Sequence, residues 1–384
     1  MLVEAVDMDV GMTSPENGAA ALDALFAICE RRGASDIHLG GGQVPRLRVQ
    51  GELLPVENGA PLSAAECDAI AYGLVATTLP SDADGTSWRE AREALSAKGA
   101  IDGATTSPGG HRYRFNVFLE NARTAVALRR LDDRFLSLEE LGLPPQLADF
   151  CAMPDGLVIV TGPTGSGKST TLATLVDMIN GERRGHIVTI EDPIEYVHES
   201  RSCLVRQRQV GRDARSFNAA LVEALRQDPD VILVGEIREI DTIRTAITAA
   251  ETGHLVFATL HAGDCAGAIE RLVAVFPAGE QDGIRKQLSM VLRGVFAQHL
   301  LPPARRGDRR VACGELLFVN TAVANLVATG RSAQIYSAIE NGRKLGMRTL
   351  DQELAELCRA GRITAETALA MSRNPEILRG WIGA

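Results

Sequence analysis

The second half of the chain carries short, nearly continuous apolar runs that are separated by segments with helical spacing. These runs are GLVIVTG, HIVTIED, DVILVGE and HLVFATLH, and all of them fall between residues 156 and 261. Strands that are apolar on both faces are typical of a parallel sheet with helices on both sides. We therefore expect an α/β domain whose sheet is mainly parallel.

The first half follows a different pattern, in which short strands alternate with helices and glycine-rich turns. Apolar residues recur at helical spacing over 18–32 and near 64–78, and residues 112–131 alternate around the turn ENA as a strand hairpin does. Residues 81–111 are polar, with Gly and Ser at both ends. A small α+β domain is therefore predicted. The predicted parts are a flexible leader at 1–18, the α+β domain at 19–131, a linker at 132–145 and the α/β domain at 146–384.

The pattern after the last apolar run predicts the closing elements of the α/β domain. Residues 285–300 are predicted to form a helix. A basic turn within LPPARRGDRR precedes a predicted strand, and the chain from 321 onward is expected to be helical.

Composition and charge exclude several functions. The formal net charge of −9 argues against sequence-independent binding of nucleic acid, because neutralising phosphates requires a basic face. The chain has no apolar stretch long enough for a transmembrane helix, so no membrane span is expected. Its first residues are acidic and lack the basic start of a signal peptide, which predicts a cytoplasmic protein.

The cysteines predict buried thiols rather than a bonded framework. Seven of them are spread widely along the chain and form no CxxC pair. An odd number at such spacing is typical of reduced thiols in intracellular cores, with a zinc site or a disulfide framework as the alternative.

The segment GPTGSGKST is the strongest chemical signal in the chain. It follows the apolar run GLVIVT, precedes the helical pattern TLATLVDMIN and has the spacing GxxxxGKS. Glycines at this spacing let backbone N–H groups wrap a phosphate chain, and the N-terminus of the next helix points at the anion. We expect Lys168 to reach the β- and γ-phosphates of ATP and Ser169 to hold Mg²⁺. The predicted phosphate-binding residues are Gly162, Pro163, Thr164, Gly165, Ser166, Gly167, Lys168, Ser169 and Thr170.

Acidic residues follow two of the predicted strands. Glu236 comes after VILVG, where we expect it to orient an attacking water, with capping of the next helix as the alternative. TIEDPIEYVH places Glu191, Asp192 and Glu195 after another strand, and three acids beside a triphosphate require a cation. Contact with Mg²⁺ through water, or activation of water, is the functional interpretation, and a solvated loop is the alternative.

Histidines close both ends of the run LVFATL. A strand rises about 3.3 Å per residue, so His254 and His261 lie roughly 23 Å apart in an extended run and cannot both touch one phosphate. Ligands bind at the carboxyl ends of strands in a parallel α/β sheet. We therefore expect His261 to lie near the γ-phosphate and His254 to have a structural or interface role.

Arginines stand on the predicted strands of the α+β domain. Such side chains most often extend their charge into solvent. In a ring of ATPases, an arginine supplied across a subunit boundary can instead stabilise charge in the transition state. Arg112, Arg114 and Arg129 are the candidates for that role.

Several motifs together resemble the type II/type IV secretion ATPases, and most closely the type IV pilus retraction branch, PilT/PilU. The matching segments are GASDIHL, LSLEELGLP, GPTGSGKST, TIEDPIEYVH, LRQDPDVILVGEIRE, AETGHLVFATLH and YSAIENGRKLGMRTLDQ, and they are spread over most of the chain. The four-cysteine zinc module that is frequent in extension-type relatives is absent, which favours the retraction branch.

The resemblance implies a PAS-like N-terminal domain, a RecA-like P-loop ATPase domain and a homohexamer that binds ATP and Mg²⁺. Lys168 and Ser169 would bind phosphate and Mg²⁺, and Glu236 would be the catalytic glutamate. Glu195 would lie near the metal and the water, and His261 near the γ-phosphate. The implied function is a motor that powers pilus retraction and twitching motility through a PilC-like platform protein, from the cytoplasmic side of the inner membrane.

Two departures from the family keep other functions open. The retraction motif AIRNLIRE stands here as AVANLVAT, with Ala324, Ala328 and Thr329 in place of two Arg and one Glu. The segment LRQDPDVILVGEIRE ends in Glu239, where the family usually has Asp. One alternative is a DotB-like ATPase of type IV secretion. The other is a PilU-like accessory subunit that modulates a true motor, and that motor would be a paralogous ATPase.

Overall fold

The computed structural model describes residues 15–49, 51–57, 59–79, 88–131, 134–305 and 307–383. These residues form two compact units. The first unit takes in the described residues up to Arg134, together with Asp192–Val197 and Gln209–Asp213. The second unit holds the other described residues from Phe135 onward.

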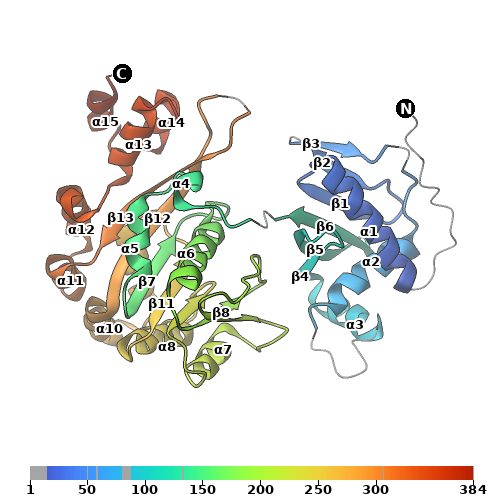
Figure 1. The fold of residues 1–384 in the computed structure, drawn as a ribbon, viewed down its shortest axis with the longest axis horizontal. Coiled ribbons are helices and arrows are strands. Elements are labelled where there is room, and N and C mark those ends of the chain that lie inside the picture. The colour runs from blue at the N-terminus through green and yellow to red at the C-terminus, as the bar shows by residue number, and fades with distance from the viewer. Residues whose placement is uncertain are drawn as a thin grey trace. The chain divides into compact units, whose positions relative to one another are not determined.

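The first unit is built on a six-stranded antiparallel sheet in the order β3-β2-β1-β6-β5-β4 (Figure 1). Its strands are β1 (Asp36–Gly40), β2 (Arg46–Val49), β3 (Glu52–Pro55), β4 (Ala100–Thr106), β5 (Arg112–Glu120) and β6 (Arg123–Arg130). Its helices are α1 (Pro15–Arg31), α2 (Ala64–Ala76) and α3 (Trp88–Lys98). The predicted α+β class is confirmed, whereas the likeness to a PAS domain stays a prediction. Helix α1 begins inside the leader predicted at 1–18, of which residues 1–14 lie outside the described part.

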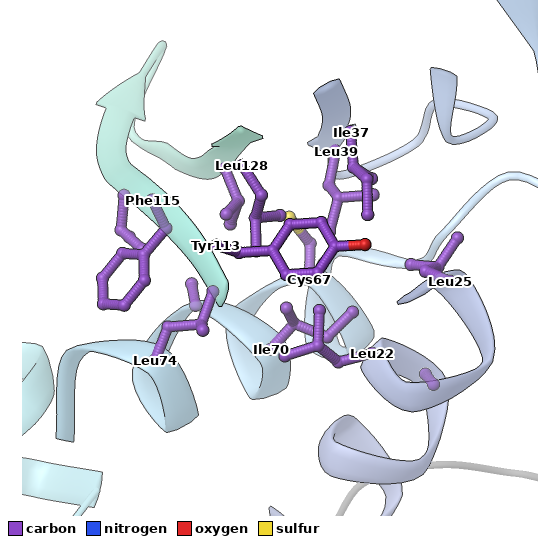
Figure 2. Close-up of a cluster of buried hydrophobic side chains, with 14 of the residues drawn as sticks. Leu22, Leu25, Ile37, Leu39, Cys67, Ile70, Leu74, Tyr113, Phe115 and Leu128 are labelled. Atoms are coloured by element: carbon purple, nitrogen blue, oxygen red, sulfur yellow. The ribbon is translucent and has the colours of Figure 1, made fainter. Parts of the chain in front are cut away.

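The core of the first unit lies between its sheet and helices α1 and α2. Figure 2 shows Tyr113 of β5 in the middle, with Leu128 and Ile37 from the sheet on one side and Ile70 from α2 on the other. None of these four side chains is more than 1% exposed. The ring of Tyr113 also packs on Phe26 of α1, with 4.4 Å between the ring centroids. The alternation in RYRFNV thus follows from burial of every second residue of β5.

Strands β5 and β6 form the hairpin predicted at 112–131. Asn121 and Ala122 make a two-residue turn with φ of 50° and 60°. Positive φ at both central residues is what a type I′ turn requires, and this turn suits the twist of the flanking strands. The hairpin is therefore confirmed, and its register places Arg114 opposite Arg129.

The second unit is built on a seven-stranded sheet in the order β13-β12-β7-β11-β10-β8-β9 (Figure 1). Its strands are β7 (Gly156–Thr161), β8 (His186–Glu191), β9 (Leu204–Gln209), β10 (Val231–Val234), β11 (Leu255–Leu260), β12 (Leu292–Leu301) and β13 (Val311–Phe318). The neighbours from β12 through β7, β11 and β10 to β8 pair parallel, and β13 pairs antiparallel with β12. The predicted apolar runs are β7, β8, β10 and β11, so the α/β class with a parallel-dominated sheet is confirmed.

The prediction of a helix over 285–300 is wrong for the second half of that range. Helix α10 (Ala278–Val291) ends before β12, which starts at the very next residue. Almost all of β12 is buried, and it pairs with the buried strand β7. Gly294 allows this packing, because a Cβ there would lie 2.3 Å from the ring of Phe150. A short apolar run does not by itself distinguish a buried strand from a buried helix, and here the pairing with β7 decides.

Helices cover the faces of this sheet, whose strands β7, β10 and β11 are buried at every residue. The helices of this unit are α4 (Leu138–Leu141), α5 (Ala148–Cys151), α6 (Lys168–Glu182), α7 (Phe217–Ala224), α8 (Ile240–Glu251), α9 (Cys265–Ala274), α10, α11 (Thr321–Ala328), α12 (Ile335–Asn341), α13 (Leu350–Arg359), α14 (Ala365–Met371) and α15 (Pro375–Ile382). Helix α6 packs on β7 beside α5, whereas α7, α8 and α10 pack one against the next. The tail from 321 is helical as predicted, and Leu354, Ile363 and Leu378 belong to a separate apolar cluster there.

The described helices are all too short or too polar to cross a bilayer. The seven cysteines are unpaired, and six of them are buried, which confirms the predicted buried thiols. Within the described ranges, no group of three or more His, Cys, Asp and Glu side chains is arranged to hold a metal ion.

His198 gives the second unit a measurable dependence on pH. Its ring packs on Phe135 with 4.6 Å between ring centroids, and its Nδ1 is buried without a hydrogen-bond partner. Burial lowers the pKa of His198 from 6.5 to about 4, against a smaller opposing effect of Asp177. The pKa of His198 is thus lower in the folded protein than in the unfolded chain. The free energy of unfolding is therefore unaffected by this group above pH 6.5, and it decreases as the pH falls toward 4, because the unfolded chain binds the proton more readily.

We expect His198→Phe to keep the ring contact with Phe135 and to remove the decrease in the free energy of unfolding that His198 causes at low pH. In urea unfolding at pH 7 and pH 4, the free energy of unfolding of the wild type should fall by up to about 3 kcal/mol more than that of the variant. Equal losses in the two proteins would contradict the lowered pKa.

Candidate active site

The carboxyl ends of the parallel strands meet along one edge of the second unit's sheet. Strands β11 and β12 flank β7, and Leu260 and Ala297 both pair with Thr161, the last residue of β7. The next residues, His261 and Gln298, therefore lie on either side of the loop that follows β7. Ligands bind at this edge in parallel α/β sheets, so the loop and its flanks are the candidate site.

The loop between β7 and α6 has a tight backbone. Gly162, Gly165 and Gly167 have φ of 144°, 77° and 92°, a region that residues with a side chain rarely adopt. A Cβ at Gly162 would lie 2.2 Å from the carbonyl oxygen of Gln298. Only glycine lets the backbone pass this close to β12, and the result is the kind of concave backbone that can cradle a phosphate.

Lys168 is the first residue of α6, and its ammonium turns back over the loop. Nζ donates hydrogen bonds to the carbonyl oxygens of Gly162 at 2.9 Å and Pro163 at 3.0 Å. Burial lowers the pKa of Lys168, and the negative charge of Glu236 opposes this effect. A cation thus stands over the loop, within the influence of the predicted catalytic glutamate.

Further polar groups of the loop suit an anion. Ser166 is only 2% exposed, and its buried Oγ has no hydrogen-bond partner. Ser169 lies exposed in the first turn of α6, where the N-terminal N–H groups favour negative charge. Backbone N–H groups, an ammonium and two hydroxyls fit a polyphosphate with Mg²⁺, and the role of Ser169 as a ligand of the ion stays a prediction.

Glu236 lies among charged side chains just after β10. Its Oε2 forms an ion pair with Arg238 Nη2 at 2.7 Å and lies 3.8 Å from His261 Nε2. The side chains of Glu236 and His261 are 31% and 29% exposed, so solvent reaches both. Helix α8 has Glu239 at its N-cap, so the alternative that Glu236 caps this helix is wrong. The structure therefore brings together Lys168, Glu236 and His261, and their roles stay predictions.

His261 is fixed at the end of β11 through its backbone. Its carbonyl oxygen accepts a hydrogen bond from Arg271 Nη1 at 2.9 Å. The following residue, Ala262, exchanges hydrogen bonds of 2.8 and 3.0 Å with the hydroxyl of Thr161 on β7. Burial, followed by the charges of Lys168 and other cations, lowers the pKa of His261. The ring is therefore neutral at pH 7 and can donate one hydrogen bond.

His254 lies at the other end of the same strand. Its Nδ1 is 2.9 Å from the carbonyl oxygen of Ala249 and 3.2 Å from Thr252 Oγ1. These contacts hold the ring against the end of α8, which is what a structural histidine requires.

Glu195, Arg112 and Arg114 belong to the first unit. Arg114 Nη1 lies 3.3 Å from Glu195 Oε1, and Arg112 Nη2 donates a hydrogen bond to the carbonyl oxygen of Ile194 at 3.0 Å. Segment 192–197 is thereby bound to β5. Glu191 belongs to the second unit, at the end of β8.

Arg129 is held by a carboxylate on the neighbouring strand. Its Nε lies 2.8 Å from Oδ1 of Asp36, and Oδ2 of the same carboxylate accepts a hydrogen bond from Ser35 Oγ at 2.7 Å. Burial acts to raise the pKa of Asp36, but the hydrogen bonds from Ser35 and Arg129 outweigh it and lower the pKa. The role of the three arginines toward ATP stays a prediction.

Sequence reasoning misses Arg238 and Gln298. Arg238 is one of many arginines, and only its position two residues after Glu236 hints at an ion pair. Gln298 falls in the segment predicted as helix, so its place beside the loop emerges only when β12 pairs with β7. A cavity of about 580 Å³ on this side of the loop, lined by Gly167, Gln298 and Arg310 among others, is likewise not foreseen.

The chain is similar to known proteins over most of its length, and not only in the phosphate loop. Residues 113–367 match the family described as type II/IV secretion system protein. The type IV pilus retraction ATPase PilT of Pseudomonas aeruginosa is 44% identical over 352 residues, which are 92% of this chain and 98% of that protein. A twitching motility protein of Neisseria gonorrhoeae is 42% identical over 86% of this chain and 85% of its own length. The type IV pilus ATPase PilU of P. aeruginosa is 36% identical over 93% and 90%.

Solved structures have the same fold. A crystal structure of the pilus retraction motor PilT with bound ADP covers 94% of this chain and 99% of its own, with a TM-score of 0.83 and 39% identity. The ATPase DotB of Legionella pneumophila covers 92% of this chain and 95% of its own, with a TM-score of 0.77 and 27% identity. The likeness therefore includes both units.

Proposed function

The chain belongs to the type II/IV secretion system protein family, and from that premise we propose that it is an ATP-hydrolysing motor that powers type IV pilus retraction. The observation that carries the proposal is the arrangement of Lys168, Glu236 and His261 around the glycine-rich loop. The assignment to retraction, and with it to twitching motility, rests on the 44% identity with a pilus retraction ATPase over almost its full length.

ATP is bound at the loop between β7 and α6 in this proposal. The triphosphate lies along the backbone N–H groups, and the ammonium of Lys168 exchanges its two carbonyl partners for phosphate oxygens. The buried hydroxyl of Ser166 gains an acceptor that the protein does not provide. Ser169 would hold Mg²⁺, and the ion would neutralise part of the negative charge on the phosphates.

Hydrolysis is assigned to the flank formed by β10 and β11. Glu236 orients a water molecule and accepts its proton as the oxygen attacks the γ-phosphorus and the bond to ADP breaks. His261, neutral at pH 7, donates a hydrogen bond to the oxygens of the transferred group. Arg238 Nη2 lies 2.7 Å from Oε2 of Glu236, and this ion pair helps to hold the carboxylate in place.

The working assembly is assigned as a homohexamer that acts on a PilC-like platform protein from the cytoplasmic side of the inner membrane. Arg112, Arg114 and Arg129 of a neighbouring subunit would then offset charge in the transition state. Glu195 would take part near the metal and the water. These roles rest on the family resemblance.

One observation favours an accessory subunit as a second candidate. In α11, Val323 and Val327, which stand in place of Ile in AIRNLIRE, are fully buried, whereas Ala324, Ala328 and Thr329, which replace its charged residues, are half-buried or exposed. The replacements thus keep the packing of the helix and remove charge from its outer side. A subunit that modulates a paralogous motor would differ there, and PilU is a relative at 36% identity. The DotB-like alternative is supported by a relative at 27% identity.

Purified protein distinguishes these candidates. A motor should have the mass of a hexamer and should release phosphate from ATP in the presence of Mg²⁺, and excess EDTA should stop the release. An accessory subunit should need the paralogous ATPase for turnover in the preparation. A monomer that shows no turnover with Mg²⁺ and membranes would contradict the proposal.

Replacing the two histidines of β11 should have unequal effects. His261→Ala should lower kcat about a hundred- to a thousandfold, because it removes a donor beside the reacting phosphate. His254→Ala is the matched control at the other end of the strand and should keep wild-type turnover. Steady-state kinetics measure both, and an unimpaired His261→Ala protein would refute the role.

A further inference from the structure

Gln298 meets the phosphate loop at both of its ends. Strand β12 lies beside β7 on the side away from β11 (Figure 1), and Ala297 pairs with Thr161. The backbone carbonyl of Gln298 lies under Gly162, where a Cβ would be 2.2 Å from the oxygen. Its side-chain Nε2 lies against Gly167, where a Cβ would be 2.9 Å away. One residue of a neighbouring strand thus supports the loop where it begins and where it ends.

The same carboxamide also holds the first turn of α6. Oε1 of Gln298 accepts a hydrogen bond from Thr171 Oγ1 at 2.6 Å, and the two residues are 3% and 0% exposed. Removing one partner of a buried hydrogen bond leaves the other unsatisfied, so this bond strongly favours one geometry. Thr171 is one helical turn after Lys168, and the bond therefore fixes the turn from which the ammonium extends.

We propose that Gln298 is a positioning residue for ATP binding, which holds the phosphate loop and the first turn of α6 in register through its bond to Thr171. The inference rests on the proposed function of the loop. Glu236 and His261 stand on the β10 and β11 flank, whereas Gln298 supports the loop from the β12 flank. Its loss should therefore weaken the binding of ground state and transition state alike, which raises KM for ATP and leaves kcat nearly unchanged.

Thr174 separates this role from ordinary helix anchoring. It stands further along α6, is 3% exposed and donates its hydroxyl to the carbonyl oxygen of Leu136 at 2.9 Å. Its bond anchors the same helix without touching β12 or the loop. Thr174→Val therefore loses a comparable buried hydrogen bond outside the site.

The test measures KM, kcat and the Kd of a fluorescent ATP analogue for a set of nearly isosteric variants. Thr171→Val should raise KM and Kd about tenfold, and kcat should stay within about twofold of wild type. Thr171→Ser keeps the hydroxyl and should restore wild-type values. Gln298→Leu should act like Thr171→Val, and the double variant should be no worse than the larger single one, because both remove the same bond. Thr174→Val should keep the wild-type KM.

Two results would overturn the inference. One is a wild-type KM in folded Thr171→Val, checked by circular dichroism, and the other is an equal rise of KM in Thr174→Val. A wild-type protein that neither binds nor hydrolyses ATP would instead overturn the proposed function, and the inference with it.

Discussion

Glu236→Gln is expected to give a protein that binds ATP and does not cleave it. The amide cannot accept the proton of the attacking water, and loss of a general base lowers kcat by about 10²–10⁴-fold. Because Gln has nearly the size of Glu and keeps an acceptor for Arg238, the end of β10 should be undisturbed. Removing a negative charge near the triphosphate should leave ATP affinity unchanged or raise it. Phosphate release and a binding titration measure the two effects separately.

Glu251→Gln is the control for this change. Glu251 is an exposed acid at the end of α8, where its Oε1 accepts a hydrogen bond from Gln287 Nε2 at 3.1 Å. This variant should hydrolyse ATP at the wild-type rate. Wild-type turnover in Glu236→Gln would show that another group activates the water.

Lys168→Ala should lose ATP binding itself. The ammonium already donates two hydrogen bonds at the loop, and each charge-assisted bond to a phosphate contributes about 1.5–3 kcal/mol. The loss of two such bonds predicts a Kd for ATP at least about a hundredfold higher. Isothermal titration with ATP and Mg²⁺ measures it directly.

Lys286→Ala is the matched lysine control. Lys286 is exposed on α10, so the same truncation there should leave the Kd unchanged. Binding of ATP by Lys168→Ala with wild-type affinity would contradict the placement of the triphosphate on the loop.

Sequence patterns predict the parallel strands well, because complete burial leaves an unmistakable apolar run. The four runs between 156 and 261 are the strands β7, β8, β10 and β11. The ends of two of them carry the phosphate loop and His261, and Glu236 follows a third closely. Those side chains could be foreseen because a site at the carboxyl ends of parallel strands depends on local order along the chain. The hairpin of β5 and β6 could equally be predicted, from the alternation of apolar and polar residues and from its short turn.

Contacts between distant segments could not be predicted in the same way. Residues 292–301 are as apolar as a buried helix, and only their pairing with β7 makes them a strand. Gln298 supports the loop through that pairing, so no local pattern reveals it. Asp36 binds Arg129 across two strands that are far apart in the sequence. In each case the physical cause is tertiary pairing, which a single sequence does not display.

The most direct test of this account is pilus retraction in cells whose only copy of the gene carries Glu236→Gln. The account predicts cells that carry excess surface pili under the electron microscope and do not twitch, because pili are assembled and not withdrawn. The wild-type gene at the same locus should restore twitching. Cells that twitch normally with the variant would contradict hydrolysis by this protein as the source of power, and cells without surface pili would contradict retraction as its direction.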